Sequence, residues 1–160
     1  RIPFMMRWPA GFRGGQTSSH IVSTLDVLPT AAAAIGLPLP PIRKYDGTNL
    51  VPYLQDPLHP GRPHGTVLWR SGPGRAIRDG DMKMWESSYG LSTNISLLFN
   101  LSKDMGEKSD LSNRAGMAKV KRDLSYKLKE WDKSLVPPHW DSRLIETTDC
   151  GGDFKALVSL

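Results

Sequence analysis

The chain has 160 residues, of which 39% are hydrophobic and five are tryptophan, so it is long and apolar enough for a globular fold with a core rather than a disordered chain. Its 21 Lys+Arg against 16 Asp+Glu give a net charge of +5, yet the sequence shows no RNP-like, zinc-finger or helix-turn-helix pattern. No run of about 18 apolar residues occurs, so the sequence predicts no membrane span.

The densest group of cations falls in a segment with helical periodicity. At this spacing the cations indicate the solvated face of a helix rather than a nucleic-acid stripe. A basic nucleic-acid binder stays the third-ranked hypothesis, and it would lose affinity steeply with salt. The group consists of Lys119, Lys121, Arg122, Lys127 and Lys129.

The single cysteine, Cys150, excludes an internal disulfide and every metal site that needs several cysteines. It lies in Thr-Asp-Cys-Gly-Gly-Asp-Phe, where the neighbouring Asp149 disfavours the thiolate. The four histidines show no His-x-His or His-x-x-x-His pair, so the spacing of metal ligands is absent as well. They are His20, His59, His64 and His139.

In chain order, residues 1–8 are expected to form a buried strand that ends in Trp-Pro. A Gly-rich loop leads to a short helix over 27–35. Asp26 is the expected N-cap, and Pro29 falls at the third helical position, whose N–H has no intrahelical acceptor. Ala31–Ala34 favour the helix, and Gly36 is placed to end it as the C′ residue.

Residues 37–64 are rich in proline and predict an ordered but irregular connector with a turn at Asp46-Gly47. Strand-like alternation resumes at 66–70. Residues 75–85 predict a hairpin around Asp79-Gly80, because glycine supplies the positive φ that a tight turn requires. A further strand is expected over 95–101.

One long helix is expected from about 115 to 134, because its apolar residues recur at intervals of three and four. Val136-Pro137-Pro138 ends it, and the last dozen residues are expected to trail. Strands followed by a long amphipathic helix predict an α+β arrangement, with a small antiparallel sheet packed against that helix. The apolar positions are Val120, Leu124, Leu128, Trp131 and Leu135.

Five short motifs lie along residues 1–140. In this order they resemble the C-terminal part of the sulfatases of the arylsulfatase type. Met105 stands where that family usually has proline, and Asn49 where it has serine. The motifs are Arg1-Ile-Pro-Phe with Arg7-Trp-Pro, Ser23-Thr-Leu-Asp-Val-Leu-Pro-Thr, Asp46-Gly with Leu50, Ala76-Ile-Arg-Asp-Gly-Asp-Met-Lys, and Leu98-Phe-Asn-Leu-Ser-Lys-Asp-Met-Gly-Glu.

The resemblance implies an alkaline-phosphatase-like α/β sulfatase fold, of which this chain would be the C-terminal part. Residues 1–40 would be the last strand and helix of the main domain, truncated at its N-terminal side, and 41–65 a connector. Residues 66–140 would be the C-terminal subdomain, and 141–160 a tail. The residues expected to hold these motifs in shape are Asp26, Pro29, Asp79, Gly80, Asp104 and Gly106, with Asp104 accepting backbone N–H bonds and Gly106 taking a positive φ.

The resemblance also implies hydrolysis of sulfate esters. In this family a cysteine in Cys-x-Pro-Ser/Ala-Arg becomes formylglycine, whose hydrate attacks sulfur while a calcium ion steadies the sulfate oxygens. Cys150 is followed by Gly-Gly-Asp and lacks that motif, and the Asp and Asn metal ligands have no counterpart here. This piece alone is therefore expected to have no catalytic residue, to bind no metal and to be inactive.

Its expected contribution is one rim of the substrate cleft. Arg70 and Arg75 flank the loop after the strand at 66–70, where either could meet an anionic group of the substrate, and His64 precedes that strand. The alternative interpretation, which we favour for all three, is that they are ordinary surface loop residues.

Two functional classes follow. The first is a sulfatase piece whose partners are the missing N-terminal sulfatase domain and, through the complete enzyme, a sulfated small molecule or glycan, in an extracytoplasmic compartment. The second is a stand-alone, non-catalytic binding domain. The apolar segment at 1–8 favours the first, because it has the composition of an interior strand.

Overall fold

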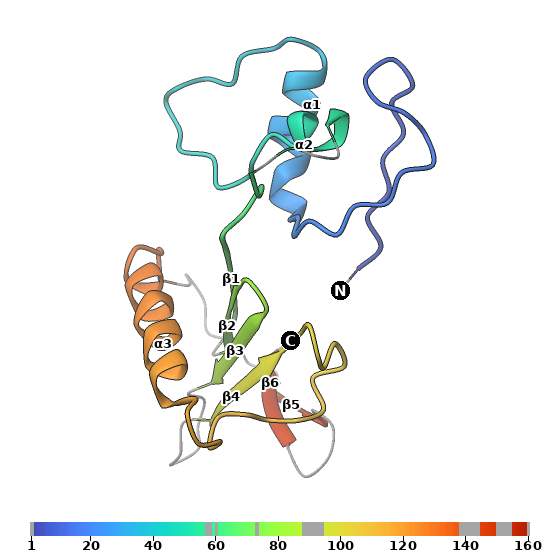
Figure 1. Cartoon of the computed structure of the whole chain (residues 1–160). Helices are drawn as coiled ribbons and strands as arrows, with labels where there is room; N and C mark the ends of the chain where they lie inside the picture. Colours follow the sequence, from blue (N-terminus) through green and yellow to red (C-terminus); the bar gives the residue numbers. More distant parts are fainter. Residues whose placement is uncertain are drawn as a thin grey trace. The chain divides into compact units, whose positions relative to one another are not determined.

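The computed structural model describes residues 2–56, 59, 61–72, 74–87 and 95–137, together with the backbone of 145–149 and 155–159. The chain divides into two compact units, Arg1–Gly65 and Thr66–Leu160. Figure 1 shows helices α1 and α2 in the first unit, and strands β1 to β6 with helix α3 in the second.

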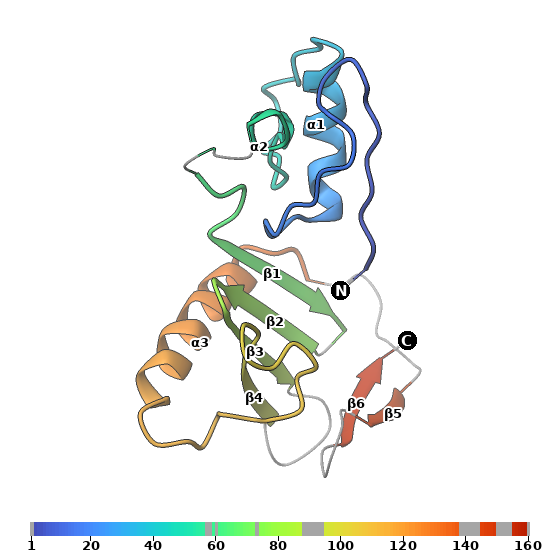
Figure 2. The ribbon, with the colours of Figure 1, turned by 45° about the vertical axis from the view of Figure 1, so that its right-hand side comes forward.

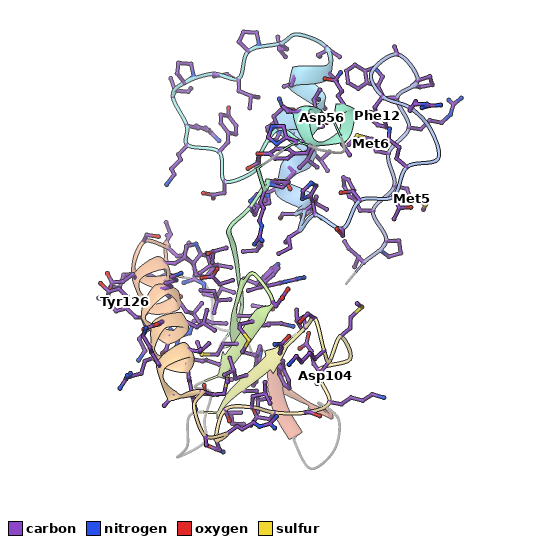
Figure 3. The ribbon with its side chains drawn as sticks, in the orientation of Figure 1. Met5, Met6, Phe12, Asp56, Asp104 and Tyr126 are labelled. Atoms are coloured by element: carbon purple, nitrogen blue, oxygen red, sulfur yellow. The ribbon has the colours of Figure 1, made fainter. Side chains whose placement is uncertain are left out.

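Residues 2–8 run extended and pair with no strand among the described residues, so the predicted strand is not formed. Ile2 and Met5 are 72% and 90% exposed, and Figure 3 labels Met5 and Met6 on this segment. The physical reason is that a single strand leaves its N–H and C=O groups without partners, and only a neighbouring strand stabilises it.

The helix predicted over 27–35 is confirmed as α1 (Val27–Ala34), but its N-terminus differs from the prediction. A 3₁₀ turn, η1 (Thr24–Asp26), precedes it, and the cap of this turn is Ser23. The Ser23 hydroxyl accepts from Leu25 N at 3.3 Å, while Ser23 N donates to Asp26 Oδ2 at 2.7 Å. Asp26 therefore forms the acidic half of a capping box and does not cap α1 itself.

Helix α1 is terminated by Gly36 as its C′ residue, as the sequence predicts. Gly36 has a φ of 69°, a left-handed conformation that glycine adopts without steric cost. Gly36 N donates to Ala33 O at 3.1 Å, and Leu37 N donates to Ala32 O at 2.9 Å. These two bonds form a Schellman motif and satisfy carbonyls that the helix leaves unpaired.

The connector holds one element that the sequence did not predict, the helix α2 (Val51–Gln55). Pro52 sits in its first turn, where a missing N–H costs no hydrogen bond. A five-residue helix in a proline-rich stretch has too few positions to show a 3.6-residue period, so periodicity did not reveal it.

The second unit contains an antiparallel sheet in the order β1-β2-β3-β4. The hairpin prediction is confirmed: Asp79 pairs with Met82, and Gly80 has a φ of 57° in the turn. The strands are β1 (Thr66–Ser71), β2 (Gly74–Asp79), β3 (Met82–Ser87) and β4 (Ile95–Asn100).

Helix α3 (Ala118–Lys133) packs on one face of this sheet, as Figure 2 shows. The register aligns one residue from each strand into a single apolar row, and this row meets Leu124 and Leu128 of the helix. The predicted α+β arrangement is therefore confirmed, with the helix beginning three residues later than predicted. The row consists of Leu68, Ile77, Met84 and Leu98.

The last residues do not simply trail. Strands β5 (Ile145–Asp149) and β6 (Lys155–Ser159) pair as an antiparallel hairpin. The prediction of a trailing tail was wrong for these residues, because two short strands stabilise each other only once they pair, and a five-residue run gives too weak a pattern to predict that pairing.

We expect Leu128→Ala to lower the free energy of unfolding of the second unit by about 2–5 kcal/mol, since it removes a fully buried side chain from the helix–sheet contact. Urea unfolding followed by tryptophan fluorescence measures this. Val136→Ala, at a position that is 70% exposed, is the control and should change the free energy by less than about 0.5 kcal/mol. Equal effects of the two substitutions would contradict the core assignment.

Candidate functional site

The carboxylate of Asp26 is fully buried and organises the first unit. Ser23 N donates to Oδ2 at 2.7 Å, and Thr48 N donates to Oδ1 at 2.8 Å. His64 Nε2 lies 2.8 Å from each of the two oxygens. A buried carboxylate is costly unless it is paired and hydrogen-bonded, and these contacts meet that requirement.

The His64 ring directs Nε2 at both carboxyl oxygens of Asp26, and the tautomer with a hydrogen on Nε2 would donate to them. The His64 side chain is 11% exposed. Sequence reasoning placed His64 on a surface loop as a rim candidate, but the structure turns its ring inward to Asp26, within the first unit. Its partner could not be found from spacing, because 38 residues separate the two.

Two threonines extend this junction, and the sequence analysis did not single out either. Leu50 N donates to the buried Thr30 Oγ1 at 2.9 Å. The Thr48 hydroxyl donates to Pro63 O at 3.2 Å. Through these bonds, residues 48–50 and 63–64 of the connector are fastened to η1 and α1. The cluster is a satisfied structural junction, and no proton transfer between its members is needed to explain it.

Arg70 and Arg75 lie directly opposite each other on β1 and β2, and Asp132 of α3 binds both. Arg70 Nη1 donates to Asp132 Oδ1 at 3.4 Å, and Arg75 Nη1 donates to Oδ2 at 2.8 Å. Arg70 Nη2 also donates to Val136 O at 2.7 Å. The structure thus brings these two predicted rim residues together, but it directs their guanidinium groups to the helix.

A second carboxylate continues the same polar row of the sheet. Glu86 is the cross-strand neighbour of Arg75, and their charged groups approach to 3.9 Å. Ser125 of α3 donates to Glu86 Oε1 at 3.0 Å. Two cations facing each other across a strand pair are destabilising unless anions separate them. Asp132 and Glu86 supply those anions, and sequence spacing gave no signal for either.

The turn after β4 holds the predicted motif residues Asp104 and Gly106. Asp104 Oδ2 accepts from Ser109 N at 2.8 Å, as the sequence predicts for a turn-stabilising carboxylate. The positive φ falls on Glu107, at 54°, and not on Gly106, so that prediction was wrong. Lys83 of β3 binds both oxygens of the Glu107 carboxylate at 2.6 and 2.8 Å, which holds the strained residue in place.

Asp110 closes the open edge of β4. Its Oδ1 accepts from Leu98 N at 2.9 Å, and Leu111 N donates to Leu98 O at 2.7 Å. The Ser112 hydroxyl donates to Asp110 Oδ2 at 2.6 Å. An edge strand with free N–H and C=O groups invites pairing with other chains, and this loop occupies both groups of Leu98.

Within the described residues, no group of three or more His, Cys, Asp or Glu side chains is arranged to hold a metal ion. A search of the same residues finds no helix with the length and apolar character that a bilayer crossing requires.

Three curated relatives share short stretches with this chain. It is 40% identical to human steryl-sulfatase over 55 residues, which are 34% of this chain and 9% of that enzyme. It is 40% identical to mouse arylsulfatase G over 50 residues, 31% of this chain and 10% of the relative. It is 28% identical to the uncharacterized sulfatase YdeN of Escherichia coli K12 over 85 residues, 53% and 15% respectively. No family model matches the chain.

Solved structures extend the similarity over most of the chain. The crystal structure of Ps i-CgsB superposes with a TM-score of 0.65 and 27% identity, covering 84% of this chain and 29% of that one. BT4656, solved with its substrate D-glucosamine-2-N,6-O-disulfate, gives a TM-score of 0.61 at 22% identity and covers 79% and 27%. The phosphonate monoester hydrolase of Agrobacterium radiobacter gives 0.51 at 23% identity and covers 89% and 30%.

The fold is therefore α+β and resembles the C-terminal part of an alkaline-phosphatase-like sulfatase fold. In sequence, the matched stretches are similar to the C-terminal portion of sulfatases. The chain spans less than a third of each of these solved structures, and the matched stretches span no more than 15% of the curated relatives.

We expect Asp26→Ala to destabilise the first unit by about 3–5 kcal/mol, because it leaves three inward-facing N–H donors without an acceptor. Hydrogen exchange measures this locally: the amides of Ser23 and Thr48 should lose protection. His64→Gln keeps an N–H donor and should cost about 1–2 kcal/mol. Unchanged protection of Thr48 in the alanine variant would show that Asp26 does not hold the connector.

The turn after β4 should respond to acid. Hydrogen bonds from the N–H groups of Ser109 and Lys108 hold the pKa of Asp104 below its ordinary value of 3.8. Burial raises the pKa of Asp110, but hydrogen bonds from Ser112 and Leu98 outweigh it, so that pKa is lowered too. A depressed folded-state pKa gives stability that is present above the unfolded value and is lost as pH falls through the folded value.

We therefore expect the free energy of unfolding of the second unit to fall between about pH 5 and pH 2. Asp110→Asn should cost about 1–3 kcal/mol at pH 7 and flatten this acid limb. Asp123→Asn, at an exposed position of α3, is the matched control. Urea unfolding at each pH measures both, and identical acid limbs for wild type and Asp110→Asn would contradict the assignment.

Proposed function

We propose that this chain is the C-terminal region of a sulfatase that hydrolyses aryl sulfates or sulfated sugars. It contributes the end of the fold and one rim of the substrate cleft, and the catalytic centre lies in a preceding part of the protein. The sequence and structural similarity to sulfatases supports the family assignment. We include sulfated sugars among the proposed substrates because the structurally similar BT4656 has a glucosamine disulfate as its substrate.

The observation that carries this proposal is the apolar surface of η1 and α1. Leu25, Val27 and Leu28 are 58%, 48% and 55% exposed, although they lie on an ordered helix with a complete capping box and a Schellman motif. A contiguous apolar patch on an ordered element is typical of an interaction surface. The partner we propose for it is the N-terminal sulfatase domain.

The family chemistry requires formylglycine and calcium, which supply the nucleophile and the stabilisation of negative charge on the sulfate oxygens. The described residues hold no cluster that suits a calcium ion, and Cys150 lacks the modification motif. The described residues therefore do not fit a calcium ion, and the sequence around Cys150 does not fit conversion to formylglycine. Both groups belong, in this proposal, to the preceding domain.

The proposal also gives His64, Arg70 and Arg75 a role at the rim of the substrate cleft. Their contacts with other residues of the chain indicate that this role is indirect. Asp132 of α3 holds Arg70 on β1 and Arg75 on β2, so both strands are tied to the helix within the second unit. Within the first unit, His64 fastens the end of the connector to Asp26. In this form each residue would contribute to a rim by positioning the backbone of its own unit, and a direct contact with sulfate is not required.

We further propose an extracytoplasmic location, in the periplasm, outside the cell or in the lysosome. The resemblance to sulfatases supports this location. A single cysteine is compatible with such a compartment.

The test is the intact mass of the native protein, with tryptic peptides sequenced upstream of Arg1. We expect a mass much larger than 17.7 kDa, a peptide carrying Cys-x-Pro-Ser-Arg or its formylglycine form, and hydrolysis of p-nitrophenyl sulfate. Cys→Ala in that peptide should abolish turnover, and the 160-residue chain alone should show none. A native product of 17.7 kDa would overturn the proposal and favour a non-catalytic binding domain.

A further inference from the structure

Helix α3 presents a cationic stripe to solvent on the side opposite its core contacts. Lys119, Arg122, Lys129 and Lys133 are exposed, and with Tyr126 they follow one another at intervals of three and four residues. At 100° per residue these five positions fall within about 80° of the helix circumference, and at 1.5 Å per residue they extend over about 21 Å. Figure 3 shows the labelled Tyr126 side chain pointing away from the sheet.

The cations of this stripe are not needed by the fold. Lys119, Arg122 and Lys129 make no ion pair with any described residue, whereas Lys133 pairs with Glu130 at 2.7 Å. The cation that does serve packing, Lys127, lies beside the stripe and binds Asp79 of β2. Among the acidic residues of α3, Asp132 is occupied by Arg70 and Arg75, Glu130 is occupied by Lys133, and the exposed Asp123 lies at the edge of the stripe. A line of positive charge therefore remains for an external anion.

Tyr126 lies in the middle of the stripe and is 67% exposed. A tyrosine ring combines a flat apolar face with a hydroxyl group, so it can stack on the C–H face of a sugar ring and bond its hydroxyls. The apolar residues of α3 face inward, since Leu124 and Leu128 are buried against the sheet. The exposed side therefore lacks the apolar anchors that an interfacial membrane helix requires.

We propose that this stripe binds the chain of a sulfated polysaccharide and holds the polymer on the enzyme while its sulfate esters are hydrolysed elsewhere. The length of about 21 Å exceeds one sugar unit, so the ligand is a polymer and not a monosaccharide. The proposal rests on the proposed sulfatase function for the choice of sulfate over other anions. The binding itself requires no catalytic centre.

The test uses the 160-residue chain, with dextran sulfate and unsulfated dextran as probes in isothermal titration at 0.1 M salt. We expect dextran sulfate to bind and dextran not to bind. Lys119→Gln with Arg122→Gln and Lys129→Gln should weaken binding at least tenfold and reduce the slope of log K against log salt by about two, since three cations are removed. Circular dichroism should show unchanged helix content in this variant.

The matched control removes three exposed cations outside the stripe, by Arg13→Gln, Lys44→Gln and Lys103→Gln, and should weaken binding less than threefold. Tyr126→Ala should weaken binding about threefold with an unchanged salt slope, and Tyr126→Phe should bind as wild type does. Equal losses in the stripe and control variants would overturn the proposal. So would equal affinity for single-stranded DNA or for anionic phospholipid vesicles.

These outcomes are separate from those of the proposed function. The native protein could lack sulfatase activity and still bind dextran sulfate through the stripe. This result would overturn the proposed function but support the polymer-binding site. Activity on p-nitrophenyl sulfate without any binding of dextran sulfate to the stripe would overturn the polymer-binding site but support the proposed function.

Discussion

A buried carboxylate sets the constraint on which the first unit depends. Asp26 has no access to water, so its two carboxyl oxygens must meet hydrogen-bond partners from the protein. Those partners come from Ser23, Thr48 and His64, which are spread over 42 residues of a chain with little regular structure. Satisfying one buried carboxyl group therefore orders the proline-rich connector, whose described residues form no strand and only one five-residue helix.

In the second unit an apolar row and a polar row share the face of the sheet beneath α3. The apolar row, with Leu124 and Leu128, supplies the burial that holds the helix. The polar row places Arg70 and Arg75 opposite each other, a pairing that is tolerable because Asp132 lies between them. Burial thus positions the helix on the sheet, and the ion pairs determine how far along the strands it lies.

The chain combines a well-capped helix with an apolar outer surface and a sheet whose arginines are already occupied. The similarity to the C-terminal portion of sulfatases accounts for the fold, and the cationic face of α3 adds a surface that this similarity does not explain.

The sequence by itself determined the local elements: the short helix that begins at residue 27 with its glycine end, the hairpin at Gly80 and the long amphipathic helix. These follow from turn chemistry and periodicity, which act over a few residues. Tertiary structure alone decided which distant groups meet. Asp26 with His64, and Asp132 with two arginines, are separated by 38 to 62 residues, so no local pattern identifies them. The strand predicted at 1–8 shows the same limit, because a strand exists only where another backbone pairs with it.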